Sequence, residues 1–131
     1  MKYLIAFFGA SAVLLGALGA HTLAPYMEAS ALNSFKTGVL YQLVHTIALL
    51  ASSKSAIPNW ARYSWCAGIV LFSFSIYLLS TDELLGINLS FLGPITPLGG
   101  LAFVAGWVGV AIDEAGYHGR RLSCARRGGD V

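Results

Sequence analysis

Four long runs with almost no charged side chains limit what this chain can fold into. They cover about residues 4–23, 36–52, 63–80 and 95–112 of 131. A helix needs about 20 mostly apolar residues to cross the ~30 Å hydrocarbon core of a bilayer, and each run approaches or reaches that length. Only 11% of the residues are charged, whereas a soluble globular domain carries about 25%. The sequence therefore predicts an all-α polytopic membrane protein, a bundle of four transmembrane helices joined by short loops.

The runs divide the chain into a four-helix transmembrane domain, residues 1–112, and a basic cytoplasmic tail, residues 113–131. The first run also resembles the apolar core of a signal peptide, but its length of about 20 residues favours a membrane span. Two cysteines, Cys66 and Cys124, are too few and too widely spaced for a disulfide framework or a zinc site. The residue pattern predicts no metal and no other cofactor.

The basic residues predict the orientation. With four spans, both termini and the middle loop lie on one side of the membrane, and that side holds seven of the eight basic residues. The seven are Lys2, Lys54, Arg62, Arg120, Arg121, Arg126 and Arg127, with Lys36 alone on the other side. Because basic residues favour the cytoplasmic side, we expect both termini in the cytoplasm and the protein in the inner (cytoplasmic) membrane. The partner that this predicts is the lipid bilayer, and nucleic acid is not implied.

Small residues recur at matching positions in the first and fourth runs. The spacing is i, i+3, i+7 and i+10 in both, and such a stripe lets another helix backbone come close. The residues are Gly9, Ala12, Gly16 and Gly19 in the first run and Gly99, Ala102, Gly106 and Gly109 in the fourth. Since these two runs are antiparallel and carry the same pattern, we expect the two small-residue stripes to pack against each other.

Polar side chains gather on one face of the second run. At about 100° per residue, Tyr41, Gln42 and His45 share one stripe. A rise of about 1.5 Å per residue places His21, Tyr41 and Tyr77 at one level in the outer leaflet, with His45 about one turn deeper. The candidate polar pocket therefore consists of His21, Tyr41, Gln42, His45 and Tyr77.

This candidate pocket has two interpretations. An ionisable group inside the membrane, such as His45, is a functional candidate by default. Hydrogen bonds from Tyr41, Gln42 and His45 to other helices, which would fix the register of the bundle, explain the same residues equally well. For His21, the simpler interpretation is a residue at a helix end that reaches interfacial water.

Motifs in all four runs resemble those of one family. They are Gly16–His21; Thr37-Gly38, Tyr41-Gln42 and His45-Thr46; Leu71-Phe72-Ser73 and Ser75-Ile76-Tyr77; and Thr96–Gly100 with Phe103 and Ala105-Gly106-Trp107. In this order they are similar to the uncharacterised small inner-membrane family called domain of unknown function 423, which has mitochondrial relatives. The resemblance implies a four-helix inner-membrane protein and transfers no activity, substrate or catalytic residue. The loop before Thr96 and the arginine-rich tail depart from the family pattern.

Two classes of function fit these observations. The first is an accessory or scaffold subunit whose helix faces bind a larger membrane complex or a second copy of the chain. The alternative is a protein that binds a lipid-soluble ligand such as a quinone through Tyr41, His45 and Tyr77. Haem between His21 and His45 is less favoured, because the two imidazoles are offset by ~8 Å along the helix axes.

Transport and catalysis are less favoured classes. A proton-coupled exporter uses a carboxylate buried in the membrane, and the four runs contain no Asp or Glu. An intramembrane serine hydrolase requires Ser73 or Ser75 beside His45, together with an oxyanion hole, and no motif supports that arrangement. An enzyme is therefore the least favoured interpretation.

Overall fold

The computed structural model describes residues 1–55 and 57–127, with side chains described up to residue 112, and every regular element in this part of the chain is a helix. In chain order the elements are α1 (Lys2–Ala17), η1 (Leu18–Leu23), α2 (Ala29–Ala51), η2 (Ser52–Lys54), α3 (Asn59–Gly68), η3 (Ile69–Phe74), α4 (Ser75–Leu85), η4 (Ser90–Leu92) and α5 (Ile95–Arg127). The segments η1 and η3 have π-helical hydrogen bonding, whereas η2 and η4 are short 3₁₀ turns. The all-α prediction is confirmed.

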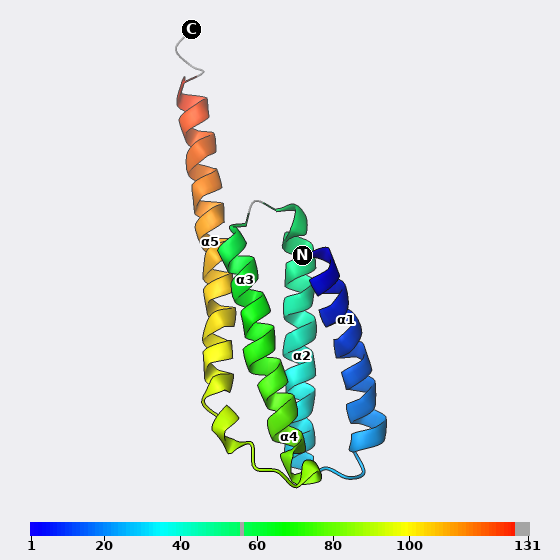
Figure 1. Ribbon diagram of the computed structural model, residues 1–131. Helices are drawn as coiled ribbons and strands as arrows, with labels where there is room; N and C mark the ends of the chain where they lie inside the picture. Colours follow the sequence, from blue (N-terminus) through cyan, green and yellow to red (C-terminus); the bar gives the residue numbers. More distant parts are fainter. Residues whose placement is uncertain (56, 128–131) are drawn as a thin grey trace.

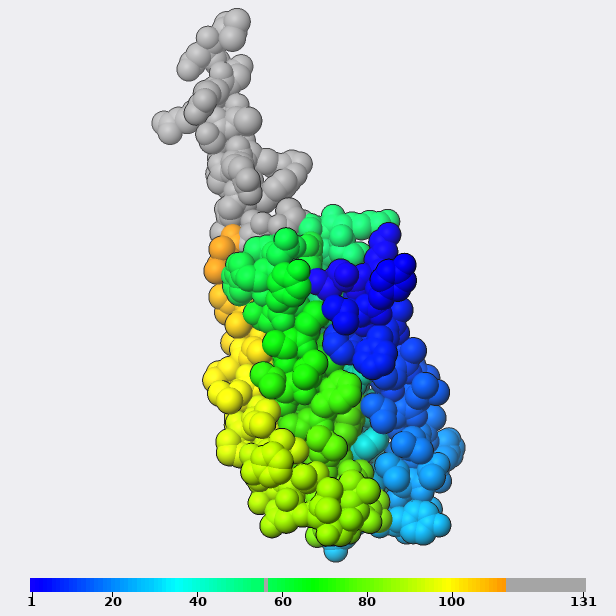
Figure 2. All heavy atoms as spheres, viewed as in Figure 1, coloured from blue at the N-terminus to red at the C-terminus, as the bar shows by residue number. Residues whose placement is uncertain are grey.

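The helices form four rods that lie side by side, with consecutive rods antiparallel (Figure 1). The first rod is α1 with η1, the second is α2 with η2, the third is the continuous run of α3, η3 and α4, and the fourth is α5. α1 packs on α2, α2 also contacts η3 and α4, and α5 packs along α3 and η3. The third rod lies between α1 and α5 on the face shown in Figure 2.

Three of the rods are long and apolar enough to cross a membrane, namely Lys2–Leu23, Asn59–Leu85 and Ser90–Ile112. α2 has the necessary length of 23 residues but a more polar sequence, because Lys36, Gln42 and His45 lie within it. Length and composition alone therefore support three of the four predicted spans.

The second rod begins earlier than the sequence analysis predicts. α2 starts at Ala29 rather than near residue 36. Its first turns are rich in serine and threonine, and these hydroxyl groups bond one turn back along the same helix. Thr37, for example, donates to the carbonyl oxygen of Asn33 at 2.9 Å. This polar segment before residue 36 can therefore satisfy its own hydroxyl groups as a helix.

The third rod is longer than predicted at both ends. It starts at Asn59 rather than near residue 63 and continues to Leu85 rather than 80. It ends where Gly86 adopts a φ of +63°, and the N–H of Ile87 then donates to the carbonyl oxygen of Asp82 at 3.1 Å. This left-handed conformation is one that glycine adopts at little cost, and it commonly ends helices.

Apolar side chains both fill the interior and cover the outer faces. One buried cluster contains Ile5, Phe8, Leu49, Trp65, Ile69 and Phe103, and a second contains Phe35, Val39 and Tyr77. On the outside, Leu14 is 70% exposed and Leu101 is 66% exposed. Apolar residues on both surfaces of a helix suit a protein whose solvent is lipid.

The two small-residue stripes do not pack against each other, so that prediction is wrong. The stripe of α1 faces α2. A Cβ atom added to Gly16 would lie 3.3 Å from Val39, and one added to Gly19 would lie 2.9 Å from the ring of Phe35.

The stripe of α5 faces the third rod instead. A Cβ atom added to Gly99 would collide with the backbone of Phe72, and one added to Gly106 would collide with the indole of Trp65. Both stripes thus lie at helix contacts. The pairing prediction failed because a small-residue stripe permits close approach without specifying which helix approaches.

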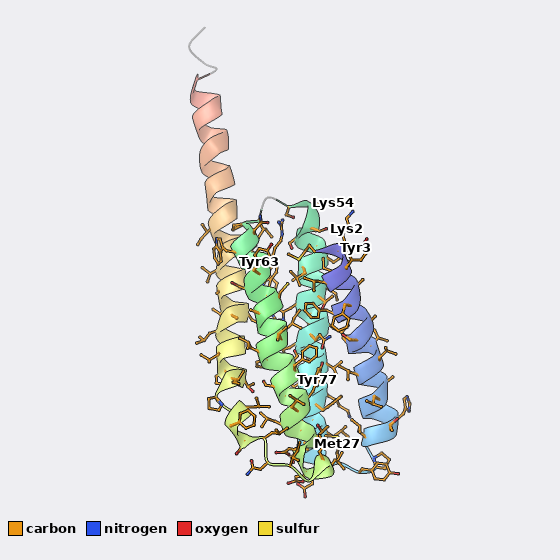
Figure 3. The ribbon with its side chains drawn as sticks, viewed as in Figure 1. Lys2, Tyr3, Met27, Lys54, Tyr63 and Tyr77 are labelled. Carbon is orange, nitrogen blue, oxygen red and sulfur yellow. The ribbon has the colours of Figure 1, made fainter. Side chains whose placement is uncertain are left out.

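The two ends of the molecule carry different charges. The start of α1, the connection between α2 and α3, and the C-terminal half of α5 lie at one end, where Figure 3 labels Lys2 and Lys54. We call this the basic end; its described basic residues are Lys2, Lys54 and Arg62. The opposite end, which we call the acidic end, has Glu28, Asp82 and Glu83 at its helix termini and connections.

Candidate functional site

Gln42, near the middle of α2, joins three helices through its side chain. Its amide nitrogen donates to the carbonyl oxygen of Phe8 and to the hydroxyl of Ser11 in α1, both at 2.8 Å. Its amide oxygen accepts a hydrogen bond of 2.8 Å from the hydroxyl of Tyr77 in α4. The side chain is fully buried, and these bonds use both of its N–H groups. We call Phe8, Ser11, Gln42 and Tyr77 the glutamine cluster.

Tyr77 reaches Gln42 because the residue one turn before Gln42 on α2 is a glycine, Gly38. A Cβ atom added to Gly38 would lie 2.9 Å from Cε1 of Tyr77, closer than side chains normally approach. The Tyr77 ring also packs on Phe35, with 4.9 Å between the ring centroids. Gly38 and Phe35 therefore hold the tyrosine hydroxyl at the glutamine amide.

His45, one turn further along α2, contacts α5. Its ring stacks on Phe103 with 3.5 Å between centroids, and its Nε2 accepts a hydrogen bond of 3.2 Å from the indole N–H of Trp107. Its Nδ1 lies 2.8 Å from the carbonyl oxygen of Tyr41. An indole N–H can only donate, so Nε2 carries the lone pair and Nδ1 carries the proton that Tyr41 accepts. We call Tyr41, His45, Phe103 and Trp107 the histidine cluster.

This arrangement leaves neither ring nitrogen of His45 free. A proton added to Nε2 would face the N–H of Trp107, donor against donor, so the geometry favours the neutral ring. An iron ion or a serine hydroxyl could reach Nε2 only after the Trp107 bond had broken. Ser75, one of the two serines considered above, instead donates to the carbonyl oxygen of Leu71 at 2.6 Å and lies 2.8 Å from the hydroxyl of Thr96.

Tyr41 forms the outer edge of the histidine cluster. Its ring lies 4.6 Å from Phe72 and 5.9 Å from Phe103, measured between centroids. The residue is 40% exposed. Among the described residues, its hydroxyl makes no hydrogen bond. Tyr41 is therefore the one member of either cluster that presents a free polar group outward.

The five residues of the candidate pocket do not form one site. Gln42 and Tyr77 belong to the glutamine cluster, whereas Tyr41 and His45 belong to the histidine cluster. His21 is exposed in η1, and no hydrogen bond or ring contact within the described part of the chain links it to the other four. The polar stripe divides because α2 has neighbours on more than one side.

Sequence reasoning missed two partners, Ser11 and Trp107. Each had a signal. Ser11 lies in the middle of an apolar run, where a hydroxyl needs a partner, and Trp107 lies within a span although tryptophan is most common at membrane boundaries. A polar group in an otherwise apolar span is therefore the first candidate for a hydrogen-bond partner of another buried polar group.

The described cavities lie away from most of these residues. The largest, of about 550 Å³, runs between α1 and α2, and two others have volumes of about 310 and 300 Å³. None of these three is lined by Tyr41, Gln42 or His45, and Tyr77 lines one of the smaller two. Through these hydrogen bonds and ring contacts, both clusters connect α2 to neighbouring helices.

Apolar outer faces, together with buried polar side chains that bond between helices, define the class, a small all-helical integral membrane protein. Within this class, the chain belongs to the family described as Protein of unknown function (DUF423), whose model matches residues 15–100. The family resemblance seen in the sequence motifs is therefore confirmed.

Relatives from several bacteria are similar over most of the chain. A UPF0382 membrane protein of Haemophilus influenzae is 42% identical over an alignment of 117 positions that covers 84% of this chain and 90% of the relative. The UPF0382 membrane protein YwdK of Bacillus subtilis is 40% identical over 81% of this chain and 88% of its own. The UPF0382 inner membrane protein YgdD of Escherichia coli is 38% identical over 72% of this chain and 73% of its own. No solved structure matches the chain.

Proposed function

We propose that all four rods cross the inner (cytoplasmic) membrane as a four-helix bundle, with both termini in the cytoplasm. The bonding of Gln42 and His45 supports a membrane position for α2, because a helix in lipid must satisfy its polar groups within the protein. The charges at the basic end support the orientation. The name of the Escherichia coli relative, an inner membrane protein, supports the location.

Two single-cysteine variants test the orientation. Ser55→Cys and Asn88→Cys place a thiol at exposed positions of the basic and acidic ends, in a chain whose own cysteines, Cys66 and Cys124, are changed to serine. We expect an impermeant maleimide to label Asn88→Cys in intact cells and Ser55→Cys only after lysis. The reverse pattern would overturn the orientation.

We further propose that the bundle is an accessory or scaffold subunit whose outer helix faces bind a larger membrane complex or a second copy of the chain. One observation carries this proposal: two buried polar side chains of α2, Gln42 and His45, bond to neighbouring helices. They are used to hold the helices in register, which suits a rigid body that acts through its surface. The outer faces of the helices are then available to bind the larger complex or the second copy.

One observation favours the alternative, a binder of a lipid-soluble ligand such as a quinone. The ring of Tyr41, whose hydroxyl makes no hydrogen bond among the described residues, lies beside the rings of Phe72 and Phe103. A quinone could stack on these rings and accept a hydrogen bond from Tyr41. The alternative rests on this single donor, because the N–H of His45 and the hydroxyl of Tyr77 are bonded elsewhere.

Native mass spectrometry of the full chain, purified in mild detergent, distinguishes the two functions. An accessory subunit should be recovered in stoichiometric complex with another membrane protein or with a second copy. Two matched variants, Leu101→Trp on α5 and Leu14→Trp on α1, alter strongly exposed positions on different rods. We expect one of them to lose the complex and the other to keep it.

The same experiment can contradict the accessory role. The accessory role would be contradicted if the wild-type chain is recovered as a monomer that carries a quinone, and if Tyr41→Phe loses this quinone while remaining folded. Quinone binding would then be the function that the experiment supports. A monomer with neither partner nor ligand, recovered also after chemical cross-linking in the membrane, would remove both functions.

A further inference from the structure

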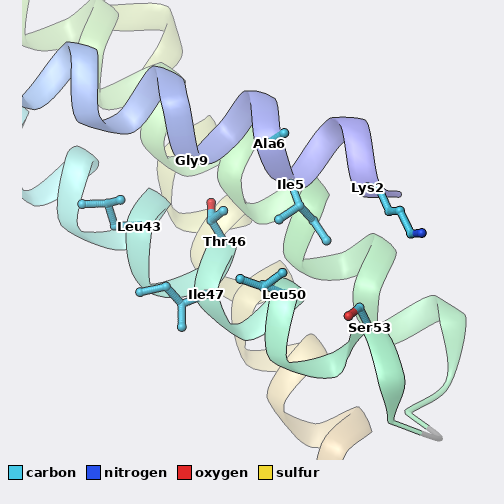
Figure 4. Close-up of a pocket in the computed structure, with 9 residues that line it drawn as sticks. All are labelled: Lys2, Ile5, Ala6, Gly9, Leu43, Thr46, Ile47, Leu50 and Ser53. Atoms are coloured by element: carbon cyan, nitrogen blue, oxygen red, sulfur yellow. The ribbon is translucent and has the colours of Figure 1, made fainter.

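A groove of about 550 Å³ runs between α1 and α2 and opens to the outside of the molecule (Figure 4). On α1 its apolar wall is formed by Ile5 and the small residues Ala6 and Gly9, and on α2 by Leu43, Ile47 and Leu50. Ile47 and Leu50 are 62% and 60% exposed, so the groove lies on an outer face. Its volume falls within the range of about 300–1,000 Å³ typical of ligand sites.

The groove is apolar along its length and basic at one end. The only hydroxyl deep within its wall, that of Thr46, donates to the carbonyl oxygen of Gln42 at 2.6 Å and is therefore occupied. Lys2 and Ser53 line the end of the groove that lies at the basic end of the molecule (Figure 4). A ligand that fills the groove would thus meet an apolar wall and then one cation.

The length of the groove matches one leaflet of a bilayer. From Lys2 to Gly9 along α1 the distance is about 10 Å, and from Leu43 to Ser53 along α2 it is about 15 Å, at 1.5 Å per residue. Half of a ~30 Å hydrocarbon core is about 15 Å. The groove therefore reaches from the head-group level, where Lys2 lies, to about the middle of the membrane.

We propose that this groove binds one anionic phospholipid from the leaflet at the basic end, with an acyl chain between α1 and α2 and its phosphate at Lys2. Such a lipid supplies an apolar chain and a negative charge with the separation that the groove requires. A transmembrane helix is about 10 Å wide with its side chains, so it could cover the groove without filling it. The inference depends on the membrane position proposed above and is independent of the accessory role.

Lipid retention after transfer from nanodiscs tests this proposal. The full chain is placed in nanodiscs of phosphatidylcholine and phosphatidylglycerol in equal amounts and then released into mild detergent, and bound lipid is counted by native mass spectrometry. We expect the wild-type chain to retain one phosphatidylglycerol. Ala6→Trp fills the groove and should abolish retention. Ala10→Trp, at an exposed position of α1 outside the groove lining, should not.

A second pair of variants tests the charge without changing the packing. Lys2→Gln should lower phosphatidylglycerol retention about fivefold, the effect expected of one basic side chain near an anionic lipid. Lys36→Gln, an exposed change near the other end of α2, should leave retention unchanged.

Three outcomes would overturn the proposal. They are equal retention by Ala6→Trp and Ala10→Trp, equal retention of phosphatidylcholine and phosphatidylglycerol by the wild-type chain, and a lipid-free dimer. If Ala6→Trp fails to fold, the Lys2→Gln and Lys36→Gln pair decides. A lipid-free dimer would overturn the lipid proposal and support the accessory role, whereas the comparisons of variants and of lipids do not involve a protein partner, so the two proposals fail separately.

Discussion

α1 and α5 carry the same stripe of small residues but are held to the rest of the molecule in different ways. At Gly99 of α5, an added Cβ atom would meet the backbone of Phe72, which cannot rotate away. At Gly9, the matching position of α1, an added Cβ atom would lie 3.7 Å from Thr46, an ordinary contact distance. The pattern is shared, yet at this first position of the stripe α5 is packed tightly and α1 loosely.

Hydrogen bonds join both helices to their neighbours. α1 receives two bonds of 2.8 Å from Gln42. α5 is joined by a bond of 3.2 Å from Trp107 to His45 and by Thr96, whose hydroxyl lies 2.8 Å from that of Ser75. At Gly99 the backbones are close, so dispersion contacts add to the attachment of α5. At Gly9 they are further apart, so polar groups carry more of the attachment of α1 and space remains for the groove. The difference predicts which substitutions damage which half of the molecule.

The largest effect is expected at the tight contact of α5. Gly99→Ala should lower the free energy of unfolding by about 3 kcal/mol, because the new methyl group forces two helix backbones apart. Unfolding in sodium dodecyl sulfate mixed with mild detergent, followed by circular dichroism, measures this loss. Leu101→Ala, at an exposed position of the same helix, is the control and should cost little. Equal losses would show that the α5 contact is not unusually tight.

A smaller effect is expected when the hydrogen bonds that hold α1 are removed. Gln42→Leu deletes three interhelical bonds and should cost roughly 2 kcal/mol, since such bonds average about 0.6 kcal/mol each in membrane proteins. Tyr77→Phe deletes one of the three and should cost about 0.6 kcal/mol. The same unfolding measurement applies to both variants. A Gln42→Leu protein as stable as the wild type would mean that packing also holds α1.

The bond between His45 of α2 and Trp107 of α5 should contribute less still. His45→Leu should cost roughly 1 kcal/mol, while His45→Gln keeps an acceptor for Trp107 and should cost little. A double-mutant cycle of His45→Leu with Trp107→Phe should give a coupling energy of about 0.6 kcal/mol. If His45→Gln abolished a cellular phenotype while the protein stayed folded, the histidine would have a role beyond holding helices together.

Much of the fold follows from the sequence, because lipid forces each apolar run to satisfy its backbone as a helix. The beginning of α2 was not predicted, because Ser34 and Thr37 make this segment look like a polar connection. In the structure, their hydroxyl groups donate to carbonyl oxygens one turn earlier in the same helix. The π-helical segments also left no recognisable pattern in the sequence.

The sequence singled out polar residues of α2 but did not predict which of them lie together in the structure. Periodicity and depth place Tyr41, Gln42 and His45 on one stripe and near one level. They do not specify which neighbouring helix each side chain meets, and Gln42 bonds to α1 and α4 while His45 bonds to α5. The partners Ser11 and Trp107 depend on that arrangement of the helices around α2, which is set by the packing of all four rods together.

The smallest effect is expected for the substitution that matches the first one, Gly9→Ala in α1. The new Cβ atom would lie at contact distance from Thr46, and no atom has to move. An alanine in a helix interior also restricts the unfolded chain more than a glycine does. The free energy of unfolding should therefore change by less than about 0.5 kcal/mol, and a slight gain is expected. The same detergent titration, run beside Gly99→Ala, compares one chemical change at equivalent positions of the two stripes. A loss at Gly9 as large as the loss at Gly99 would show that α1 is packed as tightly as α5.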